Sequence, residues 1–229
     1  MLQAGFMLAA AAAADLLLEN FTHFSTGASA TASGSVNIGR LPVGNERRWC
    51  ISVVSSADGN DPITRNSCTL DSSGVTAVVN GAHTTAGGSR TYIDIIEMPA
   101  ARGTGNKTLR STFSPAPTGT MSALYVVYSG PNGITTGDKP KGTGNSITLN
   151  FNVQPNDVII GGASCANGSS YSPLIFLDEP PDEEDDVGTN EWTIVSSVKH
   201  LGSAIAAQEK FICSSPTAAS AALAVFRGL

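Results

Sequence analysis

Short segments in which hydrophobic and polar residues alternate follow one another along most of the chain. In the clearest, Ile147, Leu149, Phe151 and Val153 alternate with Thr and Asn. This period of two is typical of a β-strand with one buried face. Segments rich in β-branched and aromatic residues predict more central strands at 48–54 and 91–96. Further strands are expected at 75–79, 121–128, 157–160, 192–198, 204–213 and 222–226.

Turn-forming residues separate these segments at short intervals, as at Asp58-Gly59, Asn80-Gly81 and Pro131-Asn132-Gly133. About ten short strands with such spacing, and no sustained helical period after residue 20, predict an all-β fold. We expect a two-sheet sandwich of Greek-key or jelly-roll type over residues 36–229. The segments 123–128 and 222–226 resemble each other at an offset of 99 residues. This echo would suit two half-sandwich sets of strands, although it is too short to define a repeat.

The first 39 residues contain no Lys or Arg, and Asp15 follows fourteen uncharged residues. A secretory signal needs a positive leading region, and a membrane span needs about 20 apolar residues, so neither is expected. We interpret residues 1–24 as an apolar anchoring arm. Its residues 7–19 could form a short helix. Residues 25–35 would be a flexible tether. The side chains expected to bind a partner or a sibling subunit are Leu2, Phe6, Met7, Leu8, Leu16, Leu17, Leu18, Phe21 and Phe24.

Charged residues make up only 14% of the chain, and the net charge is −6. The segment 177–186 holds seven of the 19 acidic residues, so the remainder is nearly neutral. No Lys/Arg cluster is present to neutralise phosphates, and nucleic acid is therefore not an expected partner. Asp182, Glu184 and Asp186 alternate within the acidic segment and are weak candidates for a Ca²⁺ site. The favoured interpretation of the segment is a solvated loop, and a contact with a basic partner is a further alternative.

Residues that carry enzyme chemistry do not form a recognisable set. His23, His83 and His200 are solitary, and the chain has no G-x-S-x-G elbow. The four cysteines, Cys50, Cys68, Cys165 and Cys213, contain no CxxC pair. We interpret the cysteines as small buried hydrophobic residues and leave their pairing open. Neither an enzyme nor a cofactor is expected.

Several strand segments resemble β-sandwich accessory proteins of tailed bacteriophages. They are RWCISV at 48–53, CTL at 68–70 with VTAV at 75–78, YIDII at 92–96, TLRSTF at 108–113 followed by ALYVVY at 123–128, and AALAVFR at 221–227. The opening Met-Leu-Gln-Ala-Gly with an alanine run is also common in small virion proteins. The resemblance covers most of residues 36–229 and carries no catalytic residues.

This resemblance implies a non-enzymatic structural protein of the virion, assembled in the host cytoplasm and anchored by its arm to capsid or tail proteins. A homo-oligomer that decorates the head or forms a head fibre is the expectation. A tail or adaptor component is one alternative. The other is a lectin-like host-attachment module, for which Tyr171 is the best candidate in a loop.

Overall fold

A computed structural model of the chain describes residues 15–57, 63–80, 88–165, 183–187, 192–212 and 219–229. These residues form antiparallel β-sheets, with one short 3₁₀ turn at Ala100–Arg102. The strands of the first half are β1 (Leu17–Thr26), β2 (Thr31–Asn37), β3 (Arg47–Ala57), β4 (Thr64–Leu70), β5 (Ser73–Gly74), β6 (Thr76–Asn80), β7 (Arg90–Glu97), β8 (Asn106–Ser114) and β9 (Gly119–Ser129). Those of the second half are β10 (Ile134–Thr136), β11 (Lys141–Thr143), β12 (Ser146–Val153), β13 (Val158–Cys165), β14 (Glu183–Val187), β15 (Trp192–Lys199), β16 (Ile205–Ile212) and β17 (Ala219–Gly228).

The expected all-β sandwich of jelly-roll type is confirmed, and the chain builds it twice. In the first half, strands in the order β1-β9-β3-β7-β6 form one sheet, and β2-β8-β4-β5 form the other. The second half repeats this order, because β17, β13, β15 and β14 correspond to β9, β3, β7 and β6. Strands β10 and β11 pair with β17 and take the position of β1. Within the described residues, β12 and β16 form its second sheet. The sequence echo between 123–128 and 222–226 therefore falls on β9 and β17, which hold equivalent positions.

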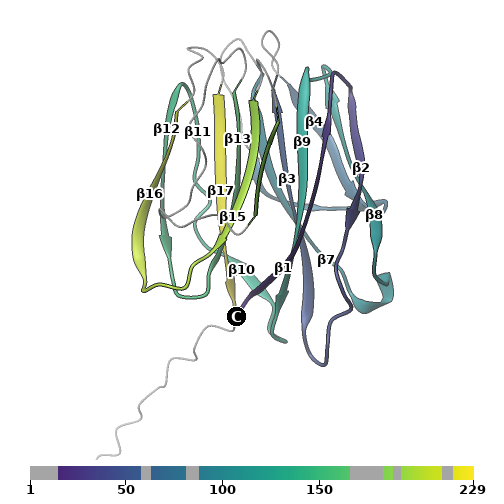
Figure 1. The fold of residues 1–229 in the computed structure, drawn as a ribbon, viewed down its shortest axis with the longest axis vertical. Coiled ribbons are helices and arrows are strands. Elements are labelled where there is room, and N and C mark those ends of the chain that lie inside the picture. Colours follow the sequence, from purple (N-terminus) through teal and green to yellow (C-terminus); the bar gives the residue numbers. More distant parts are fainter. Residues whose placement is uncertain (1–14, 58–62, 81–87, 166–182, 188–191, 213–218) are drawn as a thin grey trace, which may run out of the picture.

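The four sheets are stacked in four layers (Figure 1). We call the β1-β9-β3-β7-β6 sheet and the β17-β13-β15-β14 sheet the inner sheets, because they pack face to face. The sheets that contain β2 and β12 are the outer sheets, and each packs on the inner sheet of its own half. The molecule thus has three hydrophobic interfaces, one within each sandwich and one between the two sandwiches.

The sequence pattern of each strand matches its layer. In β9, Ala123, Tyr125 and Val127 face the second sandwich, whereas the residues between them face the core of the first. Strands β13 and β17 are likewise buried on both faces, which explains their continuous runs of apolar and small residues. Outer strand β12 alternates regularly between exposed and buried residues, as its period of two predicts.

The N-terminal expectation is corrected from residue 16 onward. Residues 17–26 form strand β1, which pairs with β9 along its length, and not a helix or a free arm. Residues 31–37 form β2, which pairs with β8, so residues 31–35 of the expected tether are part of an outer sheet, and residues 25 and 26 belong to β1. Leu16 is fully buried between the two inner sheets. Residues 1–14 lie outside the described part of the chain.

Four buried hydroxyl groups connect the inner sheets near the end opposite to the C-terminus. The Thr91 hydroxyl lies 3.4 Å from that of Ser55 and 3.3 Å from that of Ser220, and the Ser220 and Ser164 hydroxyls are 3.1 Å apart. Buried hydroxyls are costly unless they find such partners. The network therefore favours one alignment of the two sandwiches over alternatives.

Candidate interaction surface

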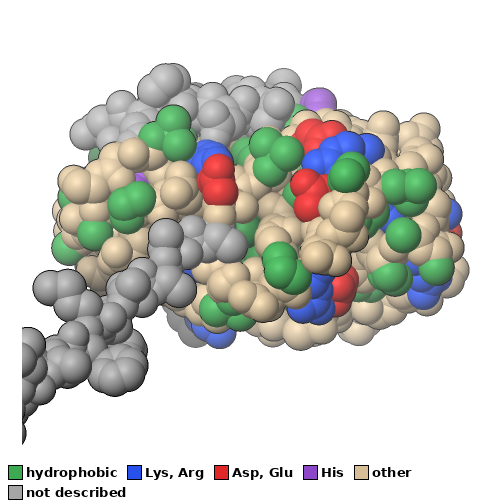
Figure 2. Space-filling view, turned by 90° about the horizontal axis from the view of Figure 1, so that it is seen from below, with side chains coloured by type: hydrophobic (Ala, Val, Ile, Leu, Met, Phe, Trp, Pro, Cys, Tyr) green, Lys and Arg blue, Asp and Glu red, His purple; other side chains and the backbone are tan. Residues whose placement is uncertain are grey.

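Among the residues that the structure describes, the large exposed hydrophobic side chains are concentrated at one end. We call this end the base; it carries the loops 38–46, 98–105, 130–133, 154–157 and 200–204 and the C-terminus, at the bottom of Figure 1. Of the large hydrophobic residues exposed in the described part of the chain, only Ile212 lies at the opposite end. The others are Leu17, Leu41, Val43, Leu201, Ile205 and Leu229. Figure 2 shows this face, where apolar side chains lie among oppositely charged groups.

Three of these residues belong to one neighbourhood on the first sandwich, which we call the basal patch: Leu17, Leu41 and Val43. Leu17 begins β1 and pairs with Tyr128 of β9. The guanidinium of Arg40 lies over the Tyr128 ring, 4.0 Å from its centre, and donates to the carbonyl of Leu41. Leu17 and loop 38–46 are therefore neighbours, although 24 residues separate Leu17 from Leu41.

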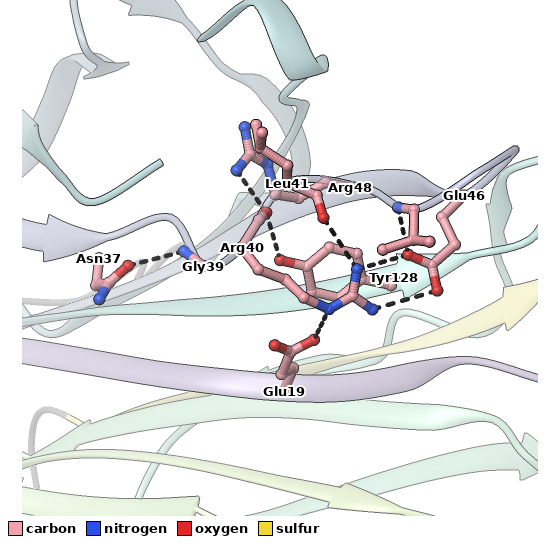
Figure 3. Close-up of polar contacts among 9 residues, drawn as sticks. Glu19, Asn37, Gly39, Arg40, Leu41, Glu46, Arg48 and Tyr128 are labelled. Atoms are coloured by element: carbon pink, nitrogen blue, oxygen red, sulfur yellow. Dashed lines mark hydrogen bonds and ion pairs between the residues drawn. The ribbon is translucent and has the colours of Figure 1, made fainter. Parts of the chain in front are cut away.

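Loop 38–46 is held by an ion-pair network that Figure 3 shows in detail. Arg40 donates to both carboxylate oxygens of Glu46, at 2.6 and 3.2 Å, and its Nε lies 2.9 Å from a carboxylate oxygen of Glu19 on β1. The backbone N–H of Val43 also donates to Glu46, at 2.9 Å. These bonds fix the loop against β1 and present Leu41 and Val43 outward, at 45% and 66% exposure.

A second arginine anchors the same loop from beneath. Arg48 is fully buried and donates to the carbonyls of Arg40 at 2.8 Å, Met98 at 3.1 Å and Gly103 at 2.8 Å. The Tyr128 hydroxyl donates to the carbonyl of Arg40 as well. Because a buried guanidinium needs several acceptors, Arg48 links loops 38–46 and 98–105 into one rigid base.

The electrostatics of the patch follow from this geometry. The hydrogen bond from Arg40, followed by that from the Val43 N–H, lowers the pKa of Glu46 below its usual value. The same bond to Glu46 raises the pKa of Arg40. Both groups are therefore ionised at neutral pH. The charged side chains bonded to the loop are engaged with one another, and Arg40, Glu19 and Glu46 remain 32–33% exposed beside the apolar groups of the patch.

The predicted partner-binding residues fall into three groups. Leu2, Phe6, Met7 and Leu8 lie outside the described residues. Leu16, Leu18, Phe21 and Phe24 pack within the chain itself: the first three join the core between the inner sheets, and Phe24 packs between the sheets of the first sandwich. Phe21 also contacts the Tyr125 ring, with 4.9 Å between centres. Only Leu17, at 46% exposure, remains available on the surface.

The start of the chain that the structure describes is fixed across the two sandwiches. Asp15 lies 2.7 Å from the Lys199 ammonium group at the basal end of β15. Leu16 then enters the core between the inner sheets, and Leu17 begins β1. The chain that precedes Asp15 therefore departs from the base.

The acidic segment is only partly described. Glu184 and Asp186 lie on β14, the edge strand of the second inner sheet, where a loop was expected, and Asp182 lies outside the described residues. An acidic edge strand discourages pairing with other sheet edges. Nowhere among the described residues do three or more His, Cys, Asp or Glu side chains gather to hold a metal ion.

The remaining candidates have structural surroundings. His23 stacks on Phe21, and the His200 ring bonds to the carbonyl of Ser203 at 2.8 Å. His83 and Tyr171 lie outside the described residues. Cys50 and Cys68 are free and buried, as expected, and desolvation raises the pKa of Cys50 to about 12. Cys165 is buried, as expected, and it is disulfide-bonded, which answers for this residue the question of pairing that the sequence left open.

One buried ion pair lies within the first sandwich. Asp94 is fully buried and accepts two bonds from Arg65, at 2.5 and 2.6 Å. The Arg65 guanidinium lies over the Tyr92 ring, 4.2 Å from its centre. Ile93 and Ile95 face the second sandwich, whereas Asp94 points to the opposite, equally buried face. With both carboxylate oxygens engaged, this pair connects β4 to β7 and serves the fold.

Leu41 and Val43 were not identified as candidates from the sequence. The available signal was weak: two apolar residues within Arg40-Leu41-Pro42-Val43-Gly44, a segment with the Pro and Gly of a turn. Apolar side chains in a loop are common, and a patch exists only because β1 brings Leu17 beside them.

The described residues include no helix long and apolar enough to cross a bilayer. Comparisons with protein-family models, curated proteins and solved structures give no match for this chain.

Proposed function

We propose that this protein is a non-enzymatic structural subunit of a larger particle, fastened to neighbouring chains through its base and residues 1–14. The observation that carries the proposal is the concentration of exposed hydrophobic side chains at the end from which residues 1–14 depart. Exposed apolar side chains gathered on one face often mark an interaction site. The particle that we propose is a tailed-phage virion, with a head-decoration or head-fibre position favoured over a tail position.

The arrangement of the sheets supports a role in assembly. The two inner sheets cover each other, and the outer strands β8 and β12 show a polar pattern on their outward faces. A rigid four-layer body of this kind leaves its ends as the places where apolar contact is available. The ion pairs of Arg40 and the buried Arg48 hold loops 38–46 and 98–105 of the base in place, which lowers the entropic cost of association.

The test is made on particles purified by density gradient from the lysate that contains the protein. We expect peptide mass spectrometry to find the chain in the particle fraction at a fixed ratio to the major shell protein. A full-length variant with Phe6→Asp and Leu8→Asp should stay folded and be depleted from particles. Recovery of the wild-type protein only in the unassembled fraction would overturn the proposal.

A further inference from the structure

The basal patch has the properties of a receptor for an uncharged apolar segment. Leu17, Leu41 and Val43 are each at least 45% exposed, which is unfavourable for large aliphatic side chains left in water. Arg40, Glu19 and Glu46 satisfy one another and hold the loop from its side. An occupant therefore needs apolar side chains, and it does not need charges to match the patch.

Residues 1–14 have the matching composition. They include Leu2, Phe6, Met7 and Leu8, six consecutive alanines, and no charged side chain. Fourteen residues can span at most about 50 Å, so this segment can reach well beyond the surface of its own molecule. It departs beside Lys199 on the second sandwich, whereas the patch lies on the first. Leu17, a residue of the patch, follows Asp15 by two positions, so residues 1–14 start at the edge of the base and are long enough to reach a neighbouring molecule.

We infer that residues 1–14 of one copy bind the basal patch of a second copy of this chain. The inference rests on the proposed structural role and names the partner of the base. Exchange of the segments between two copies closes a symmetric dimer and buries the patch of each. The sibling copy then covers the most exposed apolar side chains of the first sandwich.

The experiment uses two full-length variants, each of which removes one side of the contact. The arm variant carries Phe6→Asp and Leu8→Asp, and the patch variant carries Leu41→Asp and Val43→Asp. A matched control, Leu201→Asp, places a charge at the base on a side chain that is 74% exposed but belongs to the second sandwich. Circular dichroism establishes that each variant is folded. Sedimentation velocity then measures self-association, and differently tagged chains report mixed complexes.

We expect the wild-type chain and the control to self-associate, and each of the two variants to do so at least about 100-fold more weakly, because a charge must be desolvated in the contact. Mixing the variants should yield a complex that contains both, since the arm variant keeps its patch and the patch variant keeps its arm. A monomeric wild-type chain, or variants that do not associate when mixed, would overturn the inference.

The two proposals fail in different ways. Recovery of the patch variant in purified particles at the wild-type amount would overturn the exchange between copies and leave the structural role intact. Absence of the wild-type chain from particles would overturn the structural role, and the mixing experiment would still decide the exchange.

Discussion

The boundary between the fastening segment and the folded body can be located with a short series of variants around Leu16. This side chain is fully buried between the two inner sheets. Leu→Ala substitutions at such sites cost about 2–5 kcal/mol. In a chain of this size each kcal/mol lowers the melting temperature by about 2–4 °C. We therefore expect Leu16→Ala to lower the Tm by about 4–20 °C.

The adjacent residue supplies a matched control. Leu17 has the same side chain at 46% exposure, so Leu17→Ala should change the free energy of unfolding by less than about 1 kcal/mol. Deletion of residues 1–14 removes no described contact and should leave the Tm unchanged when both proteins are compared at concentrations low enough to keep the copies apart. Deletion of residues 1–24 removes Leu16 and most of β1, whose Leu18, Phe21 and Phe24 also pack inside. The deletion of residues 1–24 should therefore lower the free energy of unfolding by about 4–7 kcal/mol, which is comparable with the whole stability of many domains.

Urea and thermal unfolding can be followed separately in the two sandwiches, because Trp49 lies on β3 and Trp192 lies on β15. With Trp192→Phe as background, the fluorescence of Trp49 reports the first sandwich. We expect the deletion of residues 1–24 to give an unfolded or aggregated first sandwich. A cooperative transition at the wild-type midpoint after that deletion would refute the assignment of β1 to the body. Equal effects of the two alanine substitutions would refute the burial of Leu16.

Three further predictions concern the first sandwich. In Gly34→Ala, the added methyl group overlaps the Phe24 ring, so urea unfolding should show a loss of about 1–3 kcal/mol; no loss would contradict the packing of β1 on β2. Asp94→Leu leaves Arg65 buried without its partner and should cost about 3–5 kcal/mol, whereas addition of Arg65→Met should recover most of the loss. If the double variant were no more stable than Asp94→Leu, the unpaired charge would not be the cause. The pKa of Glu46 is lowered in the folded state, so its contribution to stability is present above its ordinary pKa of 4.5 and is lost as the pH falls through the folded pKa. In an NMR titration the amide that donates to Glu46 should shift in this acid range, and Glu46→Gln should abolish the shift.

The fold class was predictable because the outer strands carry a complete signal. The alternation from Ile147 to Val153 gives both the strand and its buried face. The inner strands carry less information, since a strand covered on both sides has no polar face. The runs 123–128 and 222–226 look alike for this reason, and a sequence of short strands does not distinguish one large sandwich from two stacked ones.

The N-terminal prediction failed for a specific structural reason. Leu16 and Leu18 face the core between the inner sheets, and a period of two would place residue 20 on the same side. A bulge between Leu18 and Asn20 shifts the register, so Phe21 takes that position. The alternation is thereby interrupted, and the segment reads as a general apolar stretch. Its apolar character was recognised correctly, but most of its side chains are satisfied inside the chain.

The candidate surface could not be predicted because it is made by tertiary contacts. Loop 38–46 joins an outer strand to an inner one, and only the pairing of β1 with β9 brings Leu17 beside it. The position of Arg40 depends on the Tyr128 ring and on Glu19, which come from two further strands. Each of these residues is unremarkable in sequence, and the patch is a property of their arrangement.

The duplication of the jelly roll also restricts how copies of this protein can associate. A single jelly roll can bury an apolar inner sheet against another subunit. Here each inner sheet is already covered by the other, through alternate residues such as Tyr125 and Phe226. The outer strands turn polar residues outward, and the edge strand β14 is acidic, so lateral association through faces or sheet edges is disfavoured. Among the described residues the exposed apolar side chains lie mainly at the base, where the described chain also begins, and the association that we propose uses this end.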